Sequence, residues 1–223
     1  MHTLSIDSKA VSIFQTGISG VPVIYLNTYS EEGQQVFEAA QAAGYPPFTL
    51  VAISDLDWNH DMAPWDSPAA FKKGTPFTGG ADDYLRLLVD EIIPEAEKDL
   101  ATPPAWRGIA GYSLAGLFAL YAIYRTDVFS RVGCMSGSLW FPGFHWLDTV
   151  PPTKQTLKNP TCFFAHFSQA PPLPTKENTP HFRSTNRSTN RVKSPASPRL
   201  SLAFVQELCY TPRQGNPIKP VLF

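Results

Sequence analysis

Short apolar runs and amphipathic stretches alternate along the first 150 residues of the chain. A continuous apolar run of strand length is typical of a strand that is covered on both faces, whereas apolar residues repeating every three or four positions predict a helix. The predicted strands are 10–14, 22–26, 49–53, 106–110 and 132–136, with a further candidate at 161–167, and the predicted helices are 31–43, 81–100 and 114–125. Strands that alternate with helices predict an α/β fold with a mostly parallel sheet flanked by helices.

Two stretches interrupt this pattern. Pro94 lies inside the helix predicted over 81–100 and is expected to kink or break it, because proline lacks the backbone N–H that a helix interior requires. The stretch 54–80 has no regular periodicity and is predicted to be a long loop.

A serine stands at the junction between a predicted strand and a predicted helix. Residues 111–116 read Gly-Tyr-Ser-Leu-Ala-Gly, with Ser113 in the third place. In a nucleophile elbow the serine occupies a strained strand-to-helix turn, and the residues two before and two after it must be small because the two backbones cross closely. Gly111 and Ala115 meet this requirement. We therefore predict that Ser113 is a catalytic nucleophile with a strained backbone, opening into a pocket; a tight turn without chemistry is the alternative.

The helix predicted after the serine would present its N-terminus to the site. Free backbone N–H groups and the positive end of the helix dipole stabilise an oxyanion there. The N–H of Leu114 is accordingly the first predicted oxyanion donor.

The elbow and its flanking segments resemble the esterase family that includes esterase D and the enterochelin (siderophore) esterases. The resembling segments span roughly Pro22 to Phe144 and read VIYLNTYSEEG, LDWNHDMAPW, PFTGGADDYLRLLVDEIIPE, WRGIAGYSLAGLFALYAIYRTDVFSRV and MSGSLWFPGF. The resemblance implies an α/β-hydrolase fold, a cytoplasmic location and hydrolysis of carboxylic esters without a cofactor. It also implies that Ser113 is the nucleophile and that the loop at Asn27 and Thr28 supplies the second oxyanion donor, with Thr28 as the candidate.

The long loop is interpreted as the substrate side of the site, where its tryptophans shape an apolar acyl or aryl pocket. The predicted pocket residues are Tyr29, Trp58, His60, Trp65 and Tyr112. Acidic residues from Asp55 onward also suggest a calcium loop, but His60 stands where an EF-hand needs glycine, so no metal is expected.

The family's acid and histidine motifs are not found after Ser113. Two pairs keep the order serine, acid, histidine: Asp148 with His166, and Glu177 with His181. Neither pair has the expected context, so these two histidines are interpreted as tail residues and His145 as a packing residue. The predicted function is a serine-dependent ester hydrolase with weak or absent turnover; the alternative is a non-catalytic hydrolase remnant that only binds small molecules.

The charge balance changes near residue 150. Residues 1–150 hold 8 basic and 17 acidic residues, a net charge of −9, whereas residues 151–223 hold 10 and 2, a net charge of +8. The second part also holds 12 of the 22 prolines and one of the 14 glycines. Such a stretch buries too little apolar surface to order itself. We predict a core over 1–167, an α/β-hydrolase fold incomplete at its C-terminal side, and an irregular tail over 168–223; translation out of frame from about residue 163 is one hypothesis.

The composition also bears on location and partners. No apolar run is long enough for a membrane span, and the first residues lack the pattern of a secretory signal, which favours the cytoplasm. The three cysteines are widely spaced, as expected for reduced thiols. The basic residues of the tail are scattered without an aromatic–basic module. A small-molecule ester is the expected partner, rather than nucleic acid or a membrane, and the sequence leaves the oligomeric state open.

Overall fold

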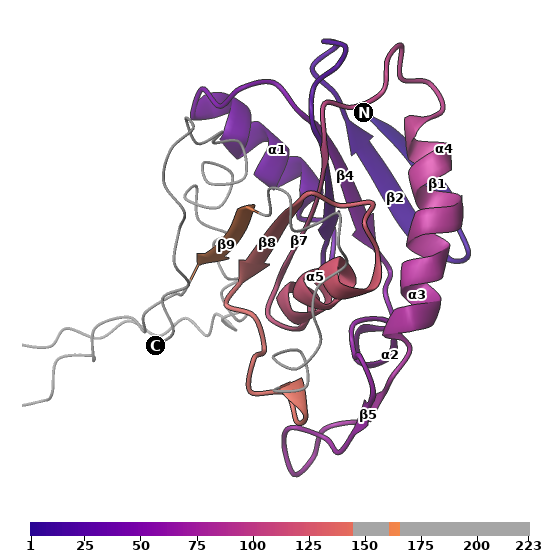
Figure 1. Cartoon of the computed structure of the whole chain (residues 1–223), viewed down its shortest axis with the longest axis vertical. Helices are drawn as coiled ribbons and strands as arrows, with labels where there is room; N and C mark the ends of the chain where they lie inside the picture. The colour runs from indigo at the N-terminus through magenta and orange to yellow at the C-terminus, as the bar shows by residue number, and fades with distance from the viewer. Residues whose placement is uncertain (145–160, 166–223) are drawn as a thin grey trace, which may run out of the picture.

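The computed structural model describes residues 1–144 and 161–165. In this part of the chain seven strands form one sheet in the order β1-β2-β4-β3-β7-β8-β9 (Figure 1). Their bounds are β1 (His2–Ile6), β2 (Lys9–Phe14), β3 (Val23–Asn27), β4 (Thr49–Ser54), β7 (Arg107–Tyr112), β8 (Arg131–Met135) and β9 (Thr161–Ala165). The pairs β1–β2 and β2–β4 are antiparallel and all other neighbours are parallel. The predicted α/β class with a mostly parallel sheet is confirmed.

Helices cover both faces of this sheet. Alternate residues of β3 join two separate apolar clusters, because successive side chains of a strand point to opposite faces. Ile24 and Leu26 belong to the apolar cluster that packs against α1 (Gly33–Ala42), whereas Val23 and Tyr25 belong to a second cluster. This second cluster includes residues of α3 (Ala81–Leu87), η1 (Leu88–Ile92), α4 (Ile93–Glu97) and α5 (Leu114–Arg125). Figure 1 shows α1 apart from α3, α4 and α5.

The helix around Pro94 is not broken. α3, η1 and α4 follow one another without a gap, and η1 is a turn of the wider π type in which the N–H of Ile93 donates to Leu88 O. A wider turn relieves the clash of a proline ring with the carbonyl four residues earlier. Of the expected kink or break, the break does not occur, because the helix widens locally instead.

The predicted loop 54–80 contains short elements. These are α2 (Trp58–Asp61) and the two-stranded hairpin of β5 (Asp66–Ser67) and β6 (Phe77–Thr78). A buried ion pair between Asp61 and Lys9 fastens α2 to the beginning of β2. The stretch is thus tied to the sheet close to its carboxyl edge.

β9 is the last strand of the sheet in the described residues. It pairs with β8 in parallel, with Ala165 opposite Met135, so the strand predicted at 161–167 is confirmed over Thr161–Ala165. The predicted tail 168–223 and the boundary at 167 lie outside the described residues. Within residues 1–144 and 161–165, no helix has the length and apolar character to cross a membrane.

Candidate active site

Ser113 lies in the turn between β7 and α5. β7 ends at Tyr112, α5 begins at Leu114, and Ser113 has φ 57° and ψ −118°. A residue with a Cβ atom rarely adopts positive φ, and such a conformation persists only where the surrounding structure enforces it. The predicted strained strand-to-helix turn at Ser113 is confirmed.

Small residues permit the close crossing that this turn needs. A Cβ atom on Gly111 would lie 2.4 Å from the carbonyl carbon of Ala115 and 2.5 Å from its Cβ. A Cβ atom on Gly116 would lie 3.0 Å from Gly111 O and 3.2 Å from the Cα of Gly137. The start of α5 therefore touches the backbones of both β7 and the turn after β8.

The end of β8 and the turn that follows it hold Ser113 at three points. The N–H of Ser113 donates to Met135 O (2.9 Å), and the N–H of Ser138 donates to Ser113 O (3.0 Å). The hydroxyl oxygens of Ser113 and Ser138 are 3.2 Å apart. Ser138 was not among the residues expected at the site. Its position after β8 could have suggested it, since the carboxyl ends of neighbouring parallel strands meet at one edge of the sheet.

The candidate oxyanion donors differ in availability. Leu114 is the first residue of α5, so its N–H has no partner within the helix, and none occurs elsewhere in the described residues. Both donors of Thr28 are already used, because its N–H and its hydroxyl each donate to Ile53 O at 2.9 Å. The expectation for Thr28 therefore needs correction. The next N–H along the chain, that of Tyr29, has no partner among the described residues.

Buried polar groups lie beneath the end of β3. Asn27 pairs with Gly111 of β7 and is 2% exposed, and its Oδ1 accepts a hydrogen bond of 2.5 Å from the Tyr84 hydroxyl. Burial, and then the negative charge of Asp61, raise the pKa of Tyr84 well above its ordinary value. Tyr84 is therefore a neutral hydrogen-bond donor at physiological pH, and it fixes the side chain next to the elbow.

The residues predicted to form the substrate pocket fall into separate groups. Tyr29 is 75% exposed and meets Trp58 edge-on, with ring centroids 5.2 Å apart. Trp65 contacts Phe141, and its indole N–H donates to Pro142 O at 2.6 Å. His60 bonds Thr78 through Nδ1 (2.8 Å), while Tyr112 packs on the face of the sheet that α1 covers.

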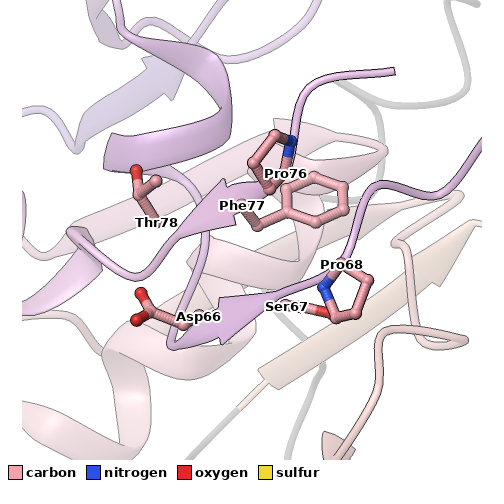
Figure 2. Close-up of a pocket in the computed structure, with 6 residues that line it drawn as sticks. All are labelled: Asp66, Ser67, Pro68, Pro76, Phe77 and Thr78. Carbon is pink, nitrogen blue, oxygen red and sulfur yellow. The ribbon is translucent and has the colours of Figure 1, made fainter. Parts of the chain in front are cut away.

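Two cavities lined by described residues lie away from Ser113. One, of about 430 Å³, is an open hollow at the β5–β6 hairpin, where Figure 2 shows Phe77 beside Pro76. A second, of about 180 Å³, is bounded by Gln15, residues 17–21, Thr49 and residues 99–102, at the amino ends of β3 and β4. The pocket expected over Ser113 stays a prediction.

The base that would activate Ser113 is not identified among the described residues. In residues 1–144 the Ser113 hydroxyl has one hydrogen-bond partner, the hydroxyl of Ser138. The candidate acids and histidines lie outside the described residues: Asp148, Glu177, His145, His166 and His181.

The fold and the elbow define an α/β hydrolase. The family described as Putative esterase matches residues 19–204, and the chain belongs to this family. The bounds of the match extend beyond residue 163, the point from which a shifted reading frame was considered.

Two curated relatives come from Bacillus subtilis. "Uncharacterized protein YbbA" is 27% identical over 57% of this chain and 54% of its own length. "Ferri-bacillibactin esterase BesA" is 29% identical over 51% of this chain and 35% of its own length. The chain thus spans about half of the first relative and a third of the second.

A solved structure shares the fold. The siderophore hydrolase EstA from Aspergillus nidulans superposes with a TM-score of 0.57 at 15% identity, over 79% of this chain and 72% of that one. At this level of identity the likeness concerns the fold alone.

Proposed function

We propose that this chain is a serine-dependent carboxylic-ester hydrolase that forms an acyl-enzyme on Ser113. The observation that carries the proposal is the strained conformation of Ser113 at the start of α5, with φ 57°. Strain of this kind costs about 1–3 kcal/mol and is typical of residues whose side chain must be presented for function. Membership of an esterase family supports the same reaction class.

The reaction follows from the groups around the elbow. Ser113 Oγ attacks the ester carbonyl carbon, its proton passes to a base, and the carbonyl oxygen becomes an oxyanion. The N–H of Leu114 and, in place of Thr28, the N–H of Tyr29 are the proposed oxyanion donors. Collapse of the intermediate expels the protonated alcohol and leaves an ester on Ser113, which water then hydrolyses.

Turnover by this chain is proposed to be weak. The chemistry needs a base for the Ser113 proton, and loss of one triad member costs several orders of magnitude in rate. The histidines after Ser113 do not occur in the motif expected of the family. The elbow and the oxyanion donors should nevertheless retain some reactivity.

The proposed substrate is a small-molecule ester with a flat, apolar portion. Two exposed aromatic side chains follow the strands on either side of β7: Tyr29 after β3, 75% exposed, and Trp140 after β8, 60% exposed. Aromatic rings at such positions favour flat ligands. The names of BesA and EstA make siderophore esters the first natural class to test.

Hydrolysis of p-nitrophenyl acetate tests the proposal. The expected rate is close to background, and any excess should vanish in Ser113→Ala but persist in Ser130→Ala, which removes a hydroxyl just before β8. Excess hydrolysis that survives Ser113→Ala would contradict the proposal. Robust turnover that is lost in His166→Ala or His181→Ala would instead identify the base and overturn the expectation of weak activity.

A further inference from the structure

Ser138 places a buried hydroxyl next to the proposed nucleophile, and its role as inferred below rests on the proposed function. Ser138 is 2% exposed, whereas Ser113 is half-buried. The 3.2 Å contact between the two hydroxyl oxygens is the one hydrogen bond that the Ser138 side chain makes within residues 1–144 and 161–165. Ser138 is also fixed through its backbone, because its N–H donates to Ser113 O at 3.0 Å.

The burial of Ser138 decides which hydroxyl donates. A hydroxyl has one proton to give, and a buried donor without an acceptor costs about 1–3 kcal/mol. If Ser113 donated, the proton of Ser138 would be left without an acceptor among the described residues. If Ser138 donates, its proton is satisfied, and the proton of the more exposed Ser113 is free.

We infer that Ser138 is a positioning residue that donates its hydroxyl proton to Ser113 Oγ. This bond occupies one lone pair of the nucleophile and holds its side chain in a single rotamer. The Ser113 proton is then not used in this bond and can be transferred to a base. The reverse bond would direct that proton into the protein and oppose its transfer.

The tight turn around Ser138 fixes its position. A Cβ atom on Gly137 would lie 2.3 Å from Cys134 Sγ, so the turn passes close to β8. Ser136 has φ 42°, a second strained residue within this turn. Because strain of this kind persists only where the structure enforces it, the distance between Ser138 and Ser113 is set by the fold rather than by the hydrogen bond alone.

Substitution separates positioning from a purely structural role. Ser138→Ala should slow covalent labelling of Ser113 by a fluorophosphonate about five- to tenfold, the effect of one hydrogen bond. Ser138→Thr keeps the hydroxyl and should restore labelling, and Ser130→Ala is the matched control, expected to label like the wild type. Labelling of Ser138→Ala within twofold of the wild type would overturn the inference. If Ser138→Ala does not fold, Ser138→Cys, whose S–H is a weak donor, should show the same slowing.

Neutron diffraction from crystals of the full chain exchanged into D₂O tests the donor direction without requiring activity. The expected density places deuterium on Ser138 Oγ, directed at Ser113 Oγ. Deuterium on Ser113 Oγ directed at Ser138, or a Ser138 deuteron directed elsewhere, would overturn the inference. The neutron result does not depend on the reactivity of Ser113. An unreactive Ser113 would therefore count against the proposed function, while the position of the deuterium would still decide the role of Ser138.

Discussion

Gly111 and Ala115 approach so closely that a Cβ atom on Gly111 would lie 2.5 Å from the Cβ of Ala115. The same Cβ would lie 2.4 Å from the carbonyl carbon and 2.5 Å from the carbonyl oxygen of Ala115. Backbone atoms in the first turn of a buried helix cannot move aside easily. This approach explains why the elbow accepts alanine at position 115 but requires glycine at position 111.

Gly111→Ala should therefore destabilise the protein strongly. Overpacking costs about 1–3 kcal/mol, and the clash with backbone places this substitution at or above the upper end. Urea-induced unfolding measures the effect. Gly74→Ala, in an exposed loop where the nearest atom to a Cβ would be 3.3 Å away, is the control and should change the stability little. Equal stability of the two variants would show that the crossing is looser than described.

The strained backbone of Ser113 predicts an unusual effect of glycine. Glycine adopts positive φ at little cost, so Ser113→Gly should be more stable than Ser113→Ala by about 1 kcal/mol. At Ser130, which does not have positive φ, the order should reverse, because glycine loses more entropy on folding. Thermal unfolding of the four variants checks both signs. Ser113→Gly that is less stable than Ser113→Ala would argue against strain at the elbow.

The ion pair between Lys9 and Asp61 should be costly to break because it is buried. Their side chains are 10% and 8% exposed, and removing one partner leaves a buried charge uncompensated. Asp61→Ala should cost about 3 kcal/mol or more of unfolding free energy. Asp83→Ala breaks an ion pair with Arg86 that is about 70% exposed and should cost less than about 0.5 kcal/mol. Similar losses of unfolding free energy in both variants would show that burial does not make the Lys9–Asp61 pair more costly to break.

Stability should fall at alkaline pH, partly through Tyr121. Burial, and then the hydrogen bond to Asp82 (2.9 Å), raise the pKa of Tyr121 from 10.0 to about 12. Below pH 10.0 the proton is bound in both the folded and unfolded states, so this contribution is fully present. Between pH 10.0 and about 12 the unfolded state releases its proton first, and the contribution is lost as pH rises.

Urea-induced unfolding from about pH 9 to about pH 11 measures this loss. Tyr121→Phe should lose less stability over this range than the wild type, although buried Tyr25 and Tyr84, whose pKa values are also raised, keep part of the dependence. Tyr29→Phe, at a side chain 75% exposed, is the control and should behave like the wild type. An unchanged pH dependence in Tyr121→Phe would contradict the assignment.

Most of the sheet could be predicted from the sequence because its strands are covered on both faces. Such strands form continuous apolar runs, and the run at 49–53 falls inside β4. β1 was missed for a local reason. Its turn uses Asp7 and Ser8, both with positive φ, whereas the strong hairpin signal in sequence is Asn-Gly or Asp-Gly. The wider turn before Pro94 could not be predicted either, because helix propensity does not distinguish a break at proline from a local widening of the helix.

The nucleophile candidate was predictable because the elbow is a contiguous motif with steric requirements. The residues that contact the nucleophile could not be predicted, since they follow other strands of the sheet. The contact of Ser138 with Ser113 depends on the parallel pairing of β7 with β8, and the loss of Thr28 as a donor depends on its bonds to Ile53 of β4. Relationships of this kind require the register between strands, which is set by tertiary packing.

Covalent labelling shows whether the fold makes Ser113 a reactive nucleophile. The full chain is treated with a fluorophosphonate in buffer and in concentrated urea, and the modified residue is located by peptide mass spectrometry. We expect slow modification of the folded chain at Ser113, at no more than one group per chain, and none in urea or in Ser113→Ala. A folded chain that stays unmodified, or one that is modified equally in Ser113→Ala, would contradict this expectation.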